Sequence, residues 1–87
     1  MGNCCQMHIA IEGRLTRDYI RACFRYPFGT LGYACVIGLV AEGNADALKF
    51  DKHIGFREVH RIKQGAAGGE DLIILEMRRS DCRWLGD

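Results

Sequence analysis

The side chains of this sequence that could bind a metal or act as nucleophiles are five cysteines and three histidines. The cysteine count is odd, no pair has the C-x-x-C spacing, and two cysteines are adjacent, which suits neither a disulfide framework nor a tetrahedral metal site. Cys4, Cys5, His8 and Cys82 could in principle supply four zinc ligands, but their spacing along the chain is unlike that of known zinc sites. We therefore expect no metal and reduced thiols, apart from two cysteines that serve as small core residues, Cys23 and Cys35.

Four arginines form a second group of candidate functional residues, because their charges could bind an anion. Arg14, Arg17, Arg21 and Arg25 recur at spacings of three and four, so they share one face of a helix. Such a face could bind phosphate or nucleic acid, although charges at helical spacing usually indicate a solvated surface. The chain carries 12 Lys and Arg against 11 Asp and Glu, a net charge of +1. This balance, with no aromatic residues interleaved on that face, argues against a nucleic-acid-binding protein.

The size and composition of the chain indicate one small globular domain, residues 1–87. Hydrophobic residues make up 48% and charged residues 26%, which excludes a disordered tail. A chain this short buries only about 60% of the surface that its unfolded form exposes, so its core is marginal. No apolar run approaches the roughly 18 residues of a membrane span, and the N-terminus lacks the apolar region of a signal peptide. We expect a cytoplasmic protein with no membrane partner.

The first half of the chain contains a strand and a helix. Alternating apolar and polar residues predict a strand over residues 6–11. Apolar residues at helical spacing predict a helix that begins after an N-cap at Thr16. This helix should be kinked or ended near Pro27 and should stop at Gly32.

The second half contains a strand, a short helix and two further strands. A nearly continuous apolar run, rich in β-branched residues, predicts a strand over residues 33–41 that is covered on both faces. Asn44 is expected to cap a helix from residue 45 to about residue 53. Alternation predicts a half-buried strand over residues 56–63, and residues 71–77 a more buried strand antiparallel to it.

The predicted order of elements is therefore strand-helix-strand-helix-strand-strand. The first two strands should be parallel neighbours joined by a right-handed helical crossover. We predict an α/β fold in which the helices pack on a mixed sheet.

The segment over residues 43–56, G-N-A-D-A-L-K-F-D-K-H-I-G-F, resembles a helix of the GNAT superfamily, the acetyl-CoA-dependent N-acyltransferases. The family pattern N-x-x-A…G-F is matched by Asn44, Ala47, Gly55 and Phe56. Each residue type suits its place, because Asn caps a helix, Ala permits close packing on a sheet and Gly adopts a left-handed conformation.

Other segments resemble a phage-associated branch of that superfamily. They are His8-Ile9-Ala10-Ile11, Leu15-Thr16-Arg17, Tyr26-Pro27-Phe28, Leu31-Gly32 and Cys82-Arg83-Trp84-Leu85. The resemblance covers nearly the whole chain but only the C-terminal half of the family's domain. It implies a partial GNAT-like fold that begins at the family's fourth strand.

The resemblance implies acetyl-CoA as the co-substrate. In the family, this molecule enters an opening between two parallel strands, and its pyrophosphate lies at the N-terminus of the following helix, where unpaired N–H groups favour an anion. The family's glycine-containing phosphate loop corresponds here to L-T-R-D-Y-I, which has no glycine, so a capped helix with a solvated arginine face stays the alternative. The residues implied are Ile9, Ala10 and Ile11 for the pantetheine, Arg14, Leu15, Thr16, Arg17 and Asp18 for the pyrophosphate, and Asn44.

Acetyl transfer needs a base for the amine proton and an acid for the departing thiolate. His8 is the candidate base, because it lies on the strand implied to flank the thioester and its ordinary pKa is near neutrality. Glu12 is a second choice, and a hydrogen-bonded structural role is the alternative for His8. The family's acid position falls on Asp51, whose carboxylate can donate a proton only if burial raises its pKa, so a role on the helix surface is the alternative.

We predict an acetyl-CoA-dependent N-acetyltransferase that modifies a primary amine of a small molecule or a peptide. The alternative is a non-catalytic half-domain that acts through self-association or a protein partner. This alternative is considered because the strand over residues 6–11 would form an open edge of the sheet. Open sheet edges tend to pair with other chains. A homodimer is the simplest arrangement that covers such an edge.

Overall fold

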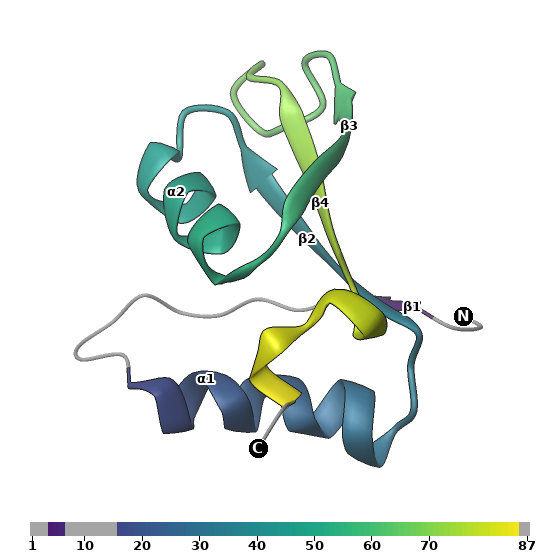
Figure 1. The fold of residues 1–87 in the computed structure, drawn as a ribbon. Coiled ribbons are helices and arrows are strands. Elements are labelled where there is room, and N and C mark those ends of the chain that lie inside the picture. The colour runs from purple at the N-terminus through teal and green to yellow at the C-terminus, as the bar shows by residue number, and fades with distance from the viewer. Residues whose placement is uncertain (1–3, 7–15, 86–87) are drawn as a thin grey trace.

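The computed structural model describes residues 4–6 and 16–85. Their strands form one four-stranded sheet in the order β1-β2-β4-β3 (Figure 1). The elements in chain order are β1 (Cys4–Gln6), α1 (Arg17–Phe24), a π-helical turn (Arg25–Thr30), β2 (Cys35–Ala41), α2 (Ala45–Ile54), β3 (Arg57–Ile62), β4 (Leu72–Arg78) and two 3-10 turns (Arg79–Asp81 and Arg83–Leu85).

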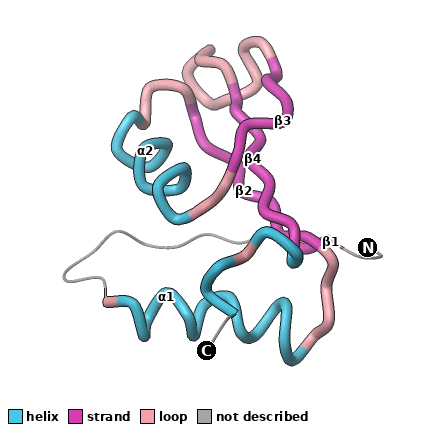
Figure 2. Tube along the Cα trace, in the orientation of Figure 1, coloured by secondary structure: helices cyan, strands magenta, loops and turns pink. Residues whose placement is uncertain are grey.

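The sheet is mixed, as the sequence predicts. β1 pairs in parallel with β2, with Cys4 opposite Cys35, and the chain between them contains α1. β4 pairs antiparallel with β2 along their whole length, and β3 pairs antiparallel with β4, with a bulge between Glu58 and His60. The parallel first pair and the antiparallel last pair are both confirmed. Figure 2 shows that α1 lies at the end of the sheet where β1 is, whereas α2 lies beside the other strands.

The helix α1 begins and ends through local side-chain chemistry. The hydroxyl of Thr16 accepts a hydrogen bond from the backbone N–H of Tyr19 at 3.1 Å, which confirms the predicted N-cap. Pro27 lies in the π-helical turn that follows, because a residue without an N–H disrupts the regular helical ladder. The φ angle of +71° at Gly32 ends the segment, as expected.

The helix α2 has the predicted cap at each end. The side-chain oxygen of Asn44 accepts from the backbone N–H of Ala47 at 3.3 Å. Gly55 ends the helix with a φ of +125°, a conformation that a residue with a side chain rarely adopts. A Cβ atom at Gly55 would also lie 3.0 Å from the terminal methyl of Met77.

The core lies between the sheet and the two helices. Phe24 of α1 is the centre of an aromatic cluster, with ring centroids 6.0 Å from both Phe28 and Phe56. The strands β2 and β4 and the end of α2 supply the other fully buried large side chains, which are Val36, Ile54, Ile73, Leu75 and Met77. This cluster fixes α1 and α2 against the sheet and thereby positions the surface between them.

Two predictions about the burial of strands are wrong. Every residue of β3 is exposed, although alternation predicts a half-buried strand, because β3 is the outermost strand of the described sheet. The strand β2 is not covered on both faces, since Leu39 is 40% exposed. The predicted strand over residues 6–11 is described only at Gln6, where β1 ends, and its remainder lies outside the described residues.

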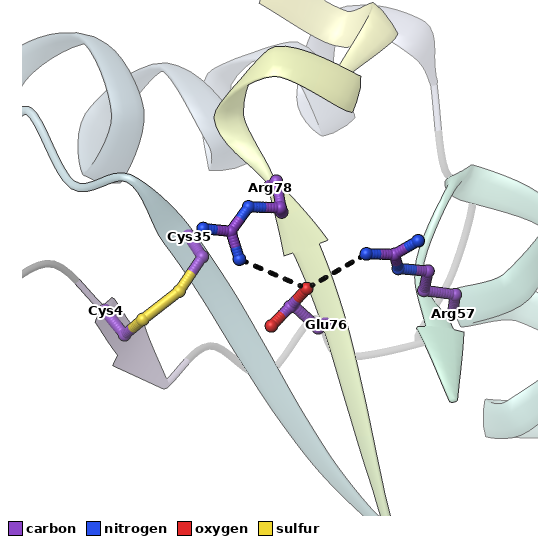
Figure 3. Close-up of a disulfide and its surroundings, with 5 residues drawn as sticks. All are labelled: Cys4, Cys35, Arg57, Glu76 and Arg78. Atoms are coloured by element: carbon purple, nitrogen blue, oxygen red, sulfur yellow. Dashed lines mark hydrogen bonds and ion pairs between the residues drawn. A yellow bond between two sulfur atoms is a disulfide. The ribbon is translucent and has the colours of Figure 1, made fainter. Parts of the chain in front are cut away.

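A disulfide between Cys4 and Cys35 corrects the prediction that Cys4 is a reduced thiol and Cys35 an unpaired one (Figure 3). The parallel register places these two residues opposite each other, with Cα atoms 4.8 Å apart, a separation that a disulfide spans. The register of two paired strands cannot be deduced from the spacing of cysteines in the sequence. Cys35 is buried as expected, and Cys5, Cys23 and Cys82 are free thiols. A zinc site that includes Cys4 is incompatible with this disulfide.

Candidate functional site

A pocket with a volume of about 510 Å³ lies between the start of α1, the end of α2 and the C-terminal turn Arg83–Leu85. Three arginines and a histidine contribute to its wall, and none of the described residues that line it is a carboxylate. Its lining residues are Arg17, Ile20, Arg21, Phe50, His53, Ile54, Arg83 and Trp84. We call this the α1–α2 pocket.

The helix α1 supplies two of the positive charges. Arg17 and Arg21 are four residues apart, so they lie one above the other on the same helix face as Ile20, which is buried. The Nε atom of Arg21 is buried and has no hydrogen-bond partner among the described residues. A buried cationic N–H without an acceptor is costly, so an acceptor atom in the pocket would be favourable there.

The end of α2 forms the opposite wall and is bonded to the C-terminal turn. Arg83 donates from Nη2 to the carbonyl oxygen of His53 at 2.6 Å, and Trp84 donates from Nε1 to the carbonyl oxygen of Ile54 at 2.7 Å. The guanidinium carbon of Arg83 lies 4.7 Å from the ring centroid of Trp84. These contacts hold one cation and one aromatic ring at the pocket wall.

The composition of the α1–α2 pocket suits an anion that carries a flat apolar group. Arginine stays charged at any physiological pH and binds phosphate oxygens through several N–H groups. Phe50 and Trp84 add aromatic surface beside these charges. The pocket can therefore bind a phosphorylated ligand.

Solved structures with similar folds include spermidine N-acetyltransferases. A mutant of the spermidine N-acetyltransferase SpeG from Vibrio cholerae is 22% identical, with a TM-score of 0.68, and the match covers 80% of this chain and 41% of that one. A chimera of the Vibrio cholerae enzyme and hSSAT is also 22% identical, with a TM-score of 0.68 over 80% of this chain and 43% of that one. The chain has the GNAT acetyltransferase fold.

The match confirms the predicted GNAT-like fold class, and this chain spans about two fifths of the length of those structures, 41% and 43%. No protein-family model matches the sequence, and the search of curated proteins gives no match. The structural likeness therefore establishes the fold.

On this GNAT fold, the cofactor-binding residues predicted at the start of α1 have different environments. Arg17 faces the α1–α2 pocket, as a phosphate-binding residue would. The Thr16 hydroxyl is used for the helix cap, and Asp18 is exposed in the first turn without lining the pocket. Asn44 likewise uses its side-chain oxygen as a cap.

Asp51, the predicted acid, lies on α2 and is half-buried. Its carbonyl oxygen accepts from the backbone N–H groups of Gly55, at 3.2 Å, and Phe56, at 2.9 Å. It does not line the α1–α2 pocket, whereas its neighbour Phe50 does. The other predicted site residues, His8, Ile9, Ala10, Ile11, Arg14 and Leu15, as well as Glu12, lie outside the described residues.

Sequence reasoning missed several residues of the pocket. The solvated arginine face is the wrong interpretation for Arg21, which is half-buried, and His53 has a place in the pocket wall. The spacing of Arg17, Ile20 and Arg21 contains the signal, because the buried Ile20 shares a helix face with both arginines, of which Arg21 is half-buried and Arg17 exposed. Trp84 packs against the core.

Residues 4–6 and 16–85 contain no group of three or more His, Cys, Asp or Glu side chains that could hold a metal ion. In the same part of the chain, no helix has both the length and the apolar character to cross a membrane.

Proposed function

We propose that this chain is a module of an acetyl-CoA-dependent N-acetyltransferase that transfers an acetyl group to a primary amine. The α1–α2 pocket is the observation that carries this proposal. It places Arg17, Arg21 and Arg83 next to aromatic rings in a GNAT acetyltransferase fold. Acetyl-CoA presents phosphate groups and an adenine ring, which match such a wall in charge and shape.

The proposed cofactor site extends from this pocket along the start of the chain. Arg14, Leu15, Thr16, Arg17 and Asp18 would surround the pyrophosphate, and Ile9, Ala10 and Ile11 would bind the pantetheine through backbone groups. The N-terminus of α1 adds its helix dipole to the charge of Arg17. Because the oxygen of Asn44 caps α2, its amide N–H groups are the donors proposed for the cofactor.

In the proposed reaction, the amine nitrogen attacks the thioester carbonyl carbon, and the carbon–sulfur bond breaks as the acetyl–nitrogen bond forms. His8 is proposed to take the proton from the amine, and Asp51 to protonate the departing sulfur of CoA. A carboxylic acid can donate this proton near neutral pH only if its surroundings disfavour the ionised form. The acceptor is proposed to be a small-molecule or peptide amine, with spermidine the first compound to test because SpeG enzymes are named for it.

Mass spectrometry of acetylated spermidine tests the proposed reaction. The wild-type chain should form the product from acetyl-CoA, whereas His8→Ala should lower the rate at least about a hundredfold, as expected for a general base. His60→Ala, an exposed histidine in β3, is the matched control and should keep the wild-type rate. Absence of product with spermidine and with a panel of peptide amines would contradict the proposal.

We also propose that the chain forms a homodimer, the arrangement on which a non-catalytic role would depend. Both outer strands of the described sheet support this, since β1 pairs only on one side and β3 exposes Val59 and Ile62 at 46% and 42%. Unpaired strand edges and exposed apolar side chains favour association with another chain. Light scattering tests the proposal, and a monomer at micromolar concentrations would contradict it.

The family branch and the cellular location of the protein are proposed as well. We propose that the chain belongs to a phage-associated branch of the superfamily, on the resemblance of segments such as Cys82-Arg83-Trp84-Leu85. We propose a cytoplasmic location, which has a consequence for the disulfide. Because cytoplasmic thiol systems keep most cysteines reduced, the Cys4–Cys35 bond would then be open for part of the protein's lifetime.

A further inference from the structure

The C-terminal turn Arg83–Leu85 lies between α1 and the end of α2. Figure 1 shows this yellow segment between the two helices. Trp84 and Leu85 pack against the hydrophobic core, so the turn is anchored on the same cluster that holds α1. The turn is therefore a bridge between the two helices that form opposite walls of the α1–α2 pocket.

The turn contacts α2 at carbonyl groups that the helix itself leaves without partners. The last carbonyls of any helix lack intrahelical donors. Here Arg83 donates to the oxygen of His53 at 2.6 Å and Trp84 to the oxygen of Ile54 at 2.7 Å. The positive charge of Arg83 also lies at the negative end of the helix dipole. Both bonds fix the direction in which the last turn of α2 points.

The same two side chains line the pocket. Arg83 and Trp84 face it together with Arg17 and Arg21, so any shift of the turn changes the pocket. Arg17 and Arg21 on α1 and Arg83 on the turn bring three positive charges to the pocket, and none of its described lining residues is a carboxylate. These charges repel one another and therefore oppose docking of the turn. An anion in the pocket reverses this effect, because it attracts all three groups and can accept from the buried Nε of Arg21.

We propose that Arg83 and Trp84 are positioning residues that set the width of the α1–α2 pocket, so that a bound phosphorylated ligand and the docked C-terminal turn stabilise each other. The identity of that ligand as CoA rests on the proposed function. The coupling is reciprocal, because a ligand that holds the turn in place must bind more tightly when the turn is already in place.

Fluorescence and hydrogen exchange test the coupling. Trp84 is the only tryptophan of the chain, so its emission reports on the turn directly. Pyrophosphate, ADP and CoA should each shift that emission to shorter wavelength and slow the exchange of the Gly55 and Phe56 amides, which close the end of α2. A purely structural turn would show no change on addition of these anions.

Two variants separate positioning from direct contact. Trp84→Phe keeps an aromatic ring and changes no charge, but it removes the donor to Ile54. It should weaken pyrophosphate binding about tenfold, the effect of one hydrogen bond to a helix end, and abolish the exchange response at Gly55. Arg83→Gln should weaken binding further. Arg79→Gln, which removes the same charge from a residue that lines a different hollow, should stay within about twofold of wild type.

The outcomes distinguish this inference from the proposed function. If CoA binds and Trp84→Phe binds it as the wild type does, the positioning role is wrong and the acetyltransferase proposal stands. If pyrophosphate and ADP bind with the expected coupling but no acetyl transfer occurs, the positioning role holds and the acetyltransferase proposal fails. If none of the three anions binds the wild-type chain, both are overturned. If Arg83→Gln does not fold, the pyrophosphate binding and the exchange response of Trp84→Phe decide whether the positioning role is correct.

Discussion

Cys4 in β1 is bonded to Cys35 in β2, directly opposite in a parallel register and 31 residues away along the chain (Figure 3). β1 has three residues and pairs only with β2 in the described sheet. A strand this short has few hydrogen bonds of its own, so the disulfide contributes much of what holds it in place. The chain that follows β1 leads to the start of α1 and the α1–α2 pocket.

Opening this disulfide should destabilise the protein. Cys4→Ser removes a crosslink across 31 residues, and the lost restriction of the unfolded chain predicts a decrease in the free energy of unfolding of about 4 kcal/mol. Urea denaturation of the oxidised protein measures it. Cys5→Ser, at the adjacent free thiol, is the control and should lose about 1 kcal/mol or less. Equal stability of the two variants would mean that the bond does not hold β1.

Replacement of Gly55 should damage the end of α2. Gly55→Ala places a side chain at a φ of +125°, within 3.0 Å of Met77, and should cost about 1 to 3 kcal/mol of unfolding free energy. Gly29→Ala is the matched control, because its Cβ would make an ordinary contact of 3.6 Å with Arg25. Thermal denaturation measures both. If the Gly55→Ala and Gly29→Ala proteins unfolded at the same temperature, this would contradict the geometry of the turn at Gly55.

Loss of the Asn44 cap should weaken α2. Asn44→Ala leaves the N–H of Ala47 without its side-chain acceptor and should lower the free energy of unfolding by about 1 kcal/mol. Asn44→Asp keeps an oxygen in the same place and should restore most of it. Urea denaturation of the three proteins gives the values, and no rescue by Asp would show that the cap is not the cause.

The buried thiol of Cys82 should make stability depend on pH. Burial raises its pKa above the usual value of 9.0, and this outweighs hydrogen bonds from the backbone of Trp84 and Leu85 that lower it. A thiol with a higher pKa in the folded than in the unfolded chain stabilises the fold below pH 9.0, and this contribution is lost as the pH rises through the folded value. The unfolding free energy of the wild type should therefore fall more steeply above pH 9.0 than that of Cys82→Ala. If the unfolding free energies of the two proteins fell equally with pH, the prediction would be contradicted.

Local signals in the sequence predicted α1, α2 and the last three strands, whereas β1 (Cys4–Gln6) overlaps the predicted first strand only at Gln6. The caps at Thr16 and Asn44 and the stops at Gly32 and Gly55 follow from short-range backbone chemistry, and all four are present. The parallel and antiparallel pairs also follow from the order of elements and the handedness of crossovers.

Features that depend on contacts between distant segments could not be predicted. The disulfide requires the register of β1 on β2, which no cysteine spacing encodes. The exposure of β3 follows from its place at the edge of the sheet. The α1–α2 pocket assembles Arg17, His53 and Arg83 from three separate elements, and only the fold shows that they face one space.

Calorimetric titration of acetyl-CoA into the oxidised chain tests the central claim most directly. We predict saturable binding that Arg17→Gln weakens at least about tenfold, because one charge-assisted hydrogen bond to phosphate is lost. Arg25→Gln, at an exposed arginine in the π-helical turn, should bind within about twofold of wild type. No binding by the wild-type chain at about 1 mM acetyl-CoA, or equal binding by the two variants, would contradict the account.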